Sequence, residues 1–197
     1  MEPEEAPAQH SNIDPSGDEC VPREVGDGLV RVAYQNVRGL SSWGLETSEE
    51  VQTMADYGMD CMGLSETKRP WTPQNKWEYN WMMKSRFGQH WTEFSSATSQ
   101  YDQKYQPGGN ALTILGNLVG RRSGSGADEQ GRFCWYTLRG QRDEGVCIIS
   151  AYRVCQTTPS QAGATSAFMQ QYTHLRKEGQ SKPNPRRQIL QDLLQLI

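Results

Sequence analysis

Glu66 is the residue of this chain whose surroundings suggest chemistry. It follows the short apolar run 61–64, and the cations Lys68 and Arg69 come soon after it. The run has strand length, so we predict a buried strand that presents Glu66 at its carboxyl end. Ligands collect at this edge of open α/β sheets, and a carboxylate there can hold a hard divalent cation through oxygen. An isolated glutamate is more often a solvated partner of a neighbouring cation, so the interpretation depends on the rest of the chain.

Two more polar residues end predicted strands in the same way. Asn36 ends the alternating, β-branched run 29–36, and Tyr152 ends a later apolar run. Acidic residues in the first turn and a following glycine predict a helix over 47–57. Strand, helix and strand then form a βαβ unit, which places the two strands parallel and brings Asn36 and Glu66 to one edge. The alternatives are a turn-forming role for Asn36 and a packed aromatic role for Tyr152.

The remaining elements are predicted from periodicity and from turn residues, and together they indicate an α/β fold. The expected strands are 77–81, 111–115, 132–138 and 145–152, with the last two forming a hairpin; the expected helices are 165–177 and one that opens at Pro185; the expected loops are 95–106, 121–131 and 156–164.

The charge of the chain is divided unevenly. Residues 1–27 hold eight acids, one base and four prolines, so we predict a disordered acidic tail followed by a folded domain over 28–197. Removing the tail from the totals of 23 acids and 20 bases leaves 15 acids and 19 bases, a net charge of +4. A mildly basic domain is compatible with a phosphate-bearing partner.

Cysteine usage and hydropathy bear on the class of protein. The five cysteines are odd in number and form no Cys-x-x-Cys pair, which indicates neither a zinc site nor a disulfide framework. The sequence shows no apolar signal region at its start and no run of membrane-spanning length. We therefore expect a soluble, reduced, intracellular protein without membrane contact, a description compatible with the nucleus.

The segment 71–105 is rich in aromatic residues, and lysines and an arginine are interleaved with them. Such a segment can stack on nucleic acid bases, but aromatic residues more often form a core, and we favour the core interpretation. His90 belongs to no motif, so a structural or surface role is expected for it.

Five short motifs in this order resemble one family. They are Arg31–Leu40, Asp60–Lys68, Pro107–Leu112, Gly131–Phe133 and Ile148–Arg153. The order resembles the endonuclease/exonuclease/phosphatase superfamily, which includes apurinic-site endonucleases and deoxyribonuclease I. The residues of these motifs and their spacing are most similar to those of the endonuclease-like domains that accompany reverse transcriptases in non-LTR retrotransposons.

The resemblance implies a four-layered α/β sandwich and hydrolysis of a DNA phosphodiester with Mg²⁺, for which Mn²⁺ could substitute. Glu66 matches the metal-binding glutamate, and Asn36 matches the asparagine that orders the site. Tyr152 matches the tyrosine that hydrogen-bonds the scissile phosphate. Arg132 matches the arginine that braces the site, and the resemblance makes Lys68 and Arg132 candidates for contacts with phosphate or DNA.

Two departures from the family bear on activity. Arg38 stands where the apurinic-site enzymes have an aspartate, and the Gly-Asp-(Phe/Trp)-Asn and Ser-Asp-His segments are absent up to Ile197. His174 lies in the wrong context to replace the missing histidine. We therefore expect the N-terminal portion of such a hydrolase, truncated at its C-terminus and inactive alone. The alternatives are a non-catalytic module that binds nucleic acid or protein through 71–105, and a phosphoinositide or sphingolipid phosphoesterase of the same superfamily.

Overall fold

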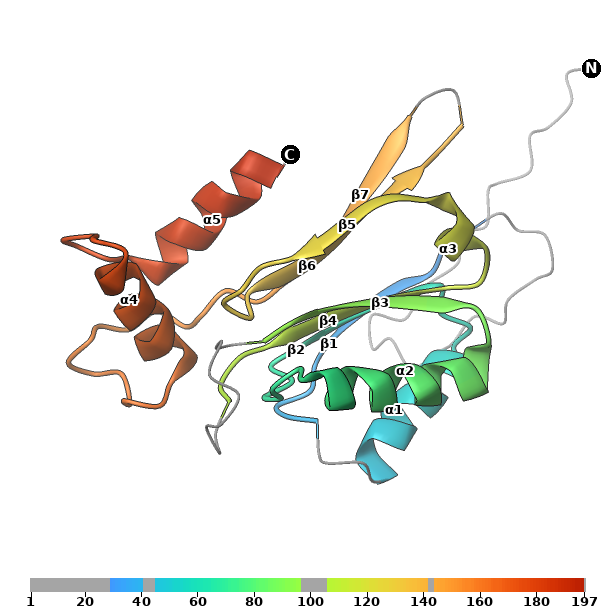
Figure 1. Ribbon diagram of the computed structural model, residues 1–197, viewed down its shortest axis with the longest axis horizontal. Helices are drawn as coiled ribbons and strands as arrows, with labels where there is room; N and C mark the ends of the chain where they lie inside the picture. The colour runs from blue at the N-terminus through green and yellow to red at the C-terminus, as the bar shows by residue number, and fades with distance from the viewer. Residues whose placement is uncertain (1–28, 41–44, 97–105, 142–143, 197) are drawn as a thin grey trace, which may run out of the picture.

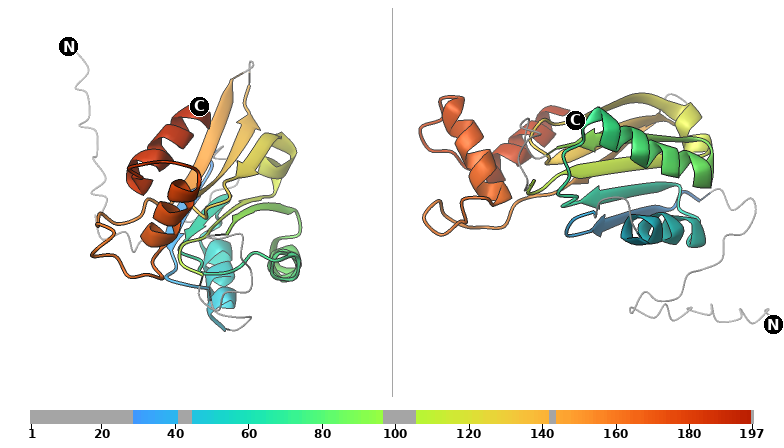
Figure 2. Two further views of the ribbon diagram at one scale, coloured as in Figure 1. Left: turned by 60° about the vertical axis from the view of Figure 1, so that its left-hand side comes forward. Right: turned by 60° about the horizontal axis from the view of Figure 1, so that its bottom comes forward.

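Two β-sheets lie face to face in the computed structural model, which describes residues 29–40, 45–96, 106–141 and 144–196 (Figure 1). The first sheet has the strand order β1-β2-β4-β3 and the second the order β5-β6-β7. Their bounds are β1 Val32–Asn36, β2 Cys61–Ser65, β3 His90–Ser95, β4 Asn110–Leu115, β5 Arg122–Ala127, β6 Phe133–Arg139 and β7 Gly145–Ala151. Helices α1 (Leu45–Asp56) and α2 (Pro73–Phe87) cover the face of the first sheet that points away from the second (Figures 1 and 2). The predicted α/β sandwich is confirmed. The predicted acidic tail lies outside the described residues.

The β1–α1–β2 unit is the part of the fold that orients the predicted site. β1 and β2 are parallel, with Asn36 opposite Ser65 in the register. All five residues of β2 are buried, because α1 and α2 cover one face of the sheet and the second sheet covers the other. The predicted parallel strands and the helix between them are confirmed. Asn36 ends β1 and Glu66 directly follows β2, so both residues lie at the same edge of the sheet.

The core has two parts, one on each face of the first sheet. Between this sheet and α2, the rings of Trp71, Tyr79 and Phe94 contact one another with centroid separations of 4.5 to 5.7 Å. Between the two sheets, Leu112 and Ile114 of β4 pack against Cys134 and Tyr136 of β6 and their neighbours. Burial of both clusters supplies the main free energy that holds the layers together.

The predicted strand over 77–81 is wrong, since these residues lie within α2. The Thr72 hydroxyl caps this helix by accepting from the backbone N–H of Asn75 at 3.2 Å, and Pro73 opens it. The apparent alternation has a helical explanation: Tyr79 and Met83 face the sheet and are buried, whereas Trp77 and Trp81 are 61% and 62% exposed. Aromatic residues spaced two apart can occupy opposite faces of a helix as well as one face of a strand.

The predicted loop over 121–131 is also wrong, because residues 122–127 form the edge strand β5, antiparallel to β6. Its glycines are explained by side chains of β6, since a Cβ atom at Gly124 would come within 2.7 Å of Thr137 Oγ1 and the Trp135 indole lies over Gly126. A Cβ atom at Gly126 would come within 2.8 Å of the indole Nε1. Strand β3, which the sequence did not predict, pairs with β4 from His90 to Ser95.

The hairpin of β6 and β7 is confirmed, with Phe133 opposite Ala151. Helices α4 (Ala167–Lys177) and α5 (Pro185–Leu196) confirm the two late helices, and the short α3 (Asn117–Arg121) precedes β5. In Figure 1, α4 and α5 lie beyond the end of the sandwich at which β7 finishes, and α3 lies at the opposite end. Most of the predicted loop 95–106 lies outside the described residues. Within the described ranges, no helix has both the length and the apolar character needed to cross a bilayer.

Candidate functional site

Three loops meet at the end of the sandwich where β1, β2 and β7 finish. The backbone N–H of Val37 donates to the Ser65 carbonyl at 3.0 Å, and that of Leu40 donates to the Thr67 carbonyl at 2.9 Å. The N–H of Lys68 donates to the Gly108 carbonyl at 2.8 Å. We call the surface formed by residues 36–40, 66–68 and 106–109, with Tyr152 from the second sheet, the rim. Backbone hydrogen bonds therefore hold its loops in one arrangement.

The two sheets come unusually close beside the rim. A Cβ atom at Gly63 of β2 would lie 2.6 Å from the Ser150 hydroxyl oxygen and 2.8 Å from the Ser150 Cβ on β7. Because Gly63 has no side chain, strands β2 and β7 can approach each other this closely. The Tyr34 hydroxyl strengthens the contact, donating to Ser65 Oγ at 2.6 Å and lying 3.2 Å from the carbonyl of Ala151. Glu66 and Tyr152 are the next residues outward from this contact on their strands.

Glu66 and Tyr152 meet across the two sheets. The Tyr152 phenol lies near enough to the Glu66 carboxylate for that group to act on its pKa. Burial raises the pKa of Tyr152 above its usual value, and the neighbouring Glu66 carboxylate raises this pKa further. The phenol therefore keeps its proton at neutral pH and can donate a hydrogen bond. The structure thus brings the acid and the phenol to one edge of the sandwich, and their functional roles stay predictions.

The backbone of the rim is strained. Among the described residues, the non-glycine residues with positive φ are Arg38 at 52°, Glu66 at 53° and Lys68 at 51°, and all three lie in the rim. The left-handed region costs an L-residue roughly 1–2 kcal/mol. Strain of this kind concentrates at functional sites, where the surrounding structure holds it in place.

Replacing Arg38 with glycine is expected to stabilise the protein. Arg38 is exposed and φ at this position suits glycine, so relief of strain should exceed the added chain entropy by about 0.5–1 kcal/mol. The melting temperature should rise by roughly 1–4 °C in a calorimetric scan. Arg139→Gly, in which an exposed strand arginine with ordinary φ is changed, should lower the melting temperature. A decrease in both variants would show that the Arg38 backbone is not strained.

Asn36 is exposed, and its side chain has a turn-forming role. Its Oδ1 accepts from the backbone N–H of Arg38 at 3.1 Å. This is the turn interpretation considered from the sequence, and it leaves one lone pair of the oxygen and the whole amide NH₂ available. Lys68 is half-buried, and its aliphatic stem lies beside Gly39, within 3.4 Å of where a Cβ would be. The functional roles predicted for Asn36 and Lys68 remain predictions.

Arg132 is buried and forms two ion pairs. Its Nε lies 2.6 Å from Asp128 Oδ2, and its Nη2 lies 2.7 Å from Asp192 Oδ2 on α5. The carbonyl of Arg132 accepts from the backbone N–H of Tyr152 at 2.7 Å. The geometry favours the bracing role implied by the family, because both ends of the guanidinium already contact carboxylates. Its predicted contact with phosphate or DNA remains a prediction.

Sequence reasoning assigned no role to several polar residues behind the rim. Ser150 Oγ donates to Asn110 Oδ1 at 2.7 Å, and Asn110 Nδ2 donates to the Arg132 carbonyl at 3.0 Å, all within the buried interior. Tyr34 and Ser65 form a second pair in the same region. One signal was available for Tyr34: it lies two residues before Asn36 and so shares its face of the strand.

The donor set at the rim fits Mg²⁺ in part. Glu66 supplies a carboxylate and Asn36 an amide oxygen, and both are oxygen ligands of the kind that Mg²⁺ prefers. Over the described residues, however, no three His, Cys, Asp or Glu side chains are grouped to hold a metal. A cation bound here would keep water in most of its coordination positions.

The two described histidines belong to β3 and α4. His90 begins β3 opposite Leu115, at the end of β4 remote from Asn110 and the rim. His174 is half exposed on α4, with its Nε2 3.0 Å from Glu178 Oε1. His90 is therefore remote from Glu66, and His174 is engaged by an acid of its own helix.

Comparison with known proteins finds a similar solved structure but no matching family model or curated sequence. No family model matches the chain, and no curated protein matches its sequence. A solved structure that is similar to it is the crystal structure of AP endonuclease LMAP from Leishmania major, with 15% identity and a TM-score of 0.46. The match covers 77% of this chain and 45% of that one, so the chain spans less than half the length of that protein.

Proposed function

We propose that this chain carries the glutamate, asparagine and tyrosine portion of a Mg²⁺-dependent phosphodiester hydrolase site that acts on DNA, of the retrotransposon endonuclease kind. The observation that carries the proposal is that Asn36, Glu66 and Tyr152 come to one rim from three strands of two sheets, with the Tyr152 phenol near the Glu66 carboxylate. It is supported by the left-handed backbone of Glu66 and Lys68, which a merely structural loop would not require.

Each residue has a role that its chemistry allows. The Glu66 carboxylate would bind Mg²⁺, and the bound ion would neutralise charge on the phosphoryl oxygens. The Tyr152 phenol stays protonated and would donate to a phosphate oxygen once the carboxylate binds the metal. The Asn36 amide would donate a further hydrogen bond beside it. The Lys68 ammonium would attract the phosphate backbone.

A general base is the part of the chemistry that the described residues do not supply. Hydrolysis requires a base to activate water, and a positioned base contributes typically about 10²–10⁴-fold to the rate. Neither described histidine lies at the rim, and Glu66 is needed for the metal. We therefore expect this chain by itself to bind a divalent cation weakly and to nick DNA no faster than background.

The test measures Mn²⁺ binding and DNA nicking together. Mn²⁺ binding, followed by electron paramagnetic resonance, should weaken by roughly tenfold or more in Glu66→Gln, because the amide cannot replace a charged ligand. Glu49→Gln, which neutralises an exposed glutamate of α1, should bind like the unmodified chain. Supercoiled plasmid with Mg²⁺ should remain intact with all three proteins.

Two results would contradict parts of the proposal. Equal Mn²⁺ binding by the unmodified chain and by Glu66→Gln would show that Glu66 does not bind the metal. Robust nicking by the unmodified chain that Glu66→Gln abolishes would support the metal role, but it would show that the expected inactivity is wrong.

A second candidate function is non-catalytic binding through α2. Trp77 and Trp81 lie one helical turn apart and are both more than half exposed, which is costly unless a partner covers them. Salt-sensitive binding of single-stranded DNA that is lost in Trp77→Ala would favour this function over the first.

A further inference from the structure

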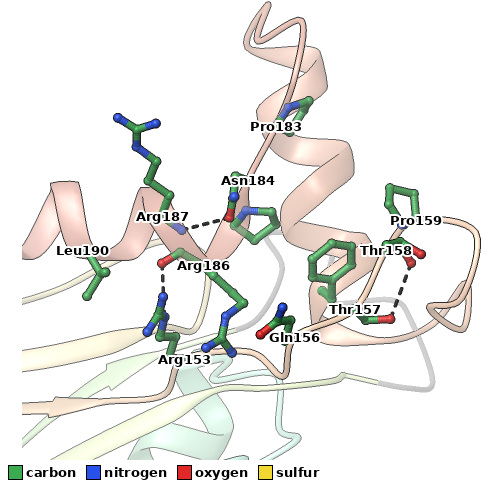
Figure 3. A pocket seen from close by; sticks show the side chains of 12 residues that line it. Arg153, Gln156, Thr157, Thr158, Pro159, Pro183, Asn184, Arg186, Arg187 and Leu190 are labelled. Atoms are coloured by element: carbon green, nitrogen blue, oxygen red, sulfur yellow. Dashed lines mark hydrogen bonds between the residues drawn. The ribbon is translucent and has the colours of Figure 1, made fainter.

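A pocket of about 490 Å³ lies beside the rim, between the segment that follows β7 and the start of α5 (Figure 3). Its walls include Arg153, which directly follows Tyr152, and Arg186 in the first turn of α5. Gln156 and Thr157 line it from the segment after β7. The pocket therefore begins at the residue after Tyr152 and is formed by side chains other than those of the proposed hydrolase site.

Three arginines line the pocket, and two of them, Arg153 and Arg186, are fixed in place without being neutralised. Arg153 Nε donates to the carbonyl of Arg186 at 3.2 Å, and Arg186 Nη1 donates to the carbonyl of Val154 at 2.6 Å. These acceptors are neutral carbonyls, and the described residues that line the pocket include no aspartate or glutamate. Both guanidinium groups thus keep their charge and several free N–H donors.

The polar part of the lining favours an anion over a cation, while Pro159, Phe168, Pro183, Pro185 and Leu190 form an apolar part of the wall. Gln156, Thr157 and Thr158 are neutral side chains that can donate hydrogen bonds. The first turn of α5 adds the partial positive charge of a helix start, and Asn184 Oδ1 caps the N–H of Arg187 at 3.0 Å. Two fixed guanidinium groups with neutral donors are the chemistry that binds phosphate oxygens.

The form of the pocket favours a polymer over a small phosphate compound. Arg153, Gln156, Thr158 and Asn184 are exposed, so the pocket is an open depression along the surface. A nucleic acid strand carries a phosphate on every nucleotide. A strand with one phosphate at Tyr152 can therefore place a neighbouring phosphate beside the residue that follows it.

We propose that this pocket binds a backbone phosphate of a nucleic acid strand, next to the phosphate at the Glu66 and Tyr152 site. The inference rests on the proposed function and deepens it by assigning a second contact with the same strand. Arg153 and Arg186 are the residues that hold this phosphate, and the sequence motifs assigned neither of them a role.

The test is DNA binding by the whole chain without metal, measured by fluorescence anisotropy with a labelled oligonucleotide in EDTA. Arg153→Gln should weaken binding by roughly eightfold at 0.1 M salt, the value for one lost phosphate contact on duplex DNA. It should also lower the slope of log K against log salt concentration by about 0.9 on duplex DNA, or ~0.7 on a single strand. Arg153→Lys keeps the charge and should remain within about threefold of the unmodified chain.

The matched control is Arg121→Gln, which removes an equally exposed arginine from α3 at the opposite end of the sandwich (Figure 1). Equal affinities of Arg153→Gln and Arg121→Gln for DNA, with melting temperatures like that of the unmodified chain, would overturn the proposal. So would displacement of Arg153-dependent binding by millimolar inorganic phosphate alone, which would indicate a site for small phosphate compounds.

The outcome is separate from that of the metal experiment. Loss of Mn²⁺ binding in Glu66→Gln with unchanged DNA binding, and loss of DNA binding in Arg153→Gln with unchanged Mn²⁺ binding, would support both proposals. If Glu66→Gln still binds Mn²⁺ while Arg153→Gln loses DNA, the pocket stands and the hydrolase assignment fails.

Discussion

Arg132→Leu is expected to lower the melting temperature by roughly 6–12 °C, which corresponds to about 3 kcal/mol for a chain of this length. The Arg132 side chain is 6% exposed and its partners Asp128 and Asp192 are 7% and 24% exposed, so the variant leaves two carboxylates with little water. Removing one partner of a buried pair typically costs ~3–5 kcal/mol. We expect the lower end, because Asp192 is partly hydrated and Asp128 Oδ1 also accepts from Ser95 Oγ at 2.7 Å.

The same substitution at Arg139 is the control, since this residue is exposed at the other end of β6. The melting temperature of Arg139→Leu should differ from that of the unmodified chain by at most about 2 °C, because isolated surface substitutions usually change the free energy of unfolding by no more than ~0.5 kcal/mol. Arg132→Lys should recover less than half of the loss, because one ammonium cannot match the planar fork that spans two carboxylates. A melting temperature for Arg132→Leu within 2 °C of the unmodified chain would show that these pairs add no stability.

The Arg132 variants also separate the two roles considered for this residue. If Arg132 only braces the site, its substitution should lower the melting temperature strongly but should leave the DNA affinity of the folded protein nearly unchanged. A residue that contacts phosphate should lose a salt-dependent contact in the anisotropy measurement as well. We expect the first result, because the guanidinium contacts Asp128 and Asp192.

Gly63→Ala is expected to destabilise the protein by about 2–3 kcal/mol. Its new methyl group would lie 2.6 Å from Ser150 Oγ and 2.8 Å from Ser150 Cβ, so the two sheets must separate or Tyr34 and Ser150 must shift. Overpacking of this kind usually costs ~1–3 kcal/mol. Separation would also expose Tyr152 to water and move it away from the Glu66 carboxylate, so the pKa of Tyr152 should fall towards the ordinary tyrosine value in an NMR titration.

Two variants check that the cost arises from this contact. Gly120→Ala, in α3, has no atom within 4 Å of the new Cβ and should be neutral or stabilising. Ser150→Gly should recover part of the loss in the Gly63→Ala background, so that the two changes are not additive. Additive effects, or an unchanged Tyr152 titration, would show that this contact does not set the spacing of the rim.

The parts of the fold that the sequence predicted correctly are those governed by neighbouring residues. The alternation before Asn36, the helix between the first two strands and the hairpin of β6 and β7 follow from local periodicity and turn chemistry. Residues 77–81 and 121–131 were misassigned for a physical reason. Trp77, Tyr79 and Trp81 fit either period, and the glycines of β5 are explained only by Thr137 and Trp135, which contact them from another strand.

The sequence alone therefore determined that Asn36, Glu66 and Tyr152 each lie at the carboxyl end of a strand or directly after it, because strand ends depend on local pattern. It also determined that Asn36 and Glu66 share an edge, because a βαβ connection permits one arrangement. The tertiary structure decided that Tyr152 meets Glu66, that Arg132 is paired with Asp192 on α5, and that Arg153 and Arg186 line one pocket. These contacts join residues distant in the chain, and packing between layers selects them, so no local pattern encodes them.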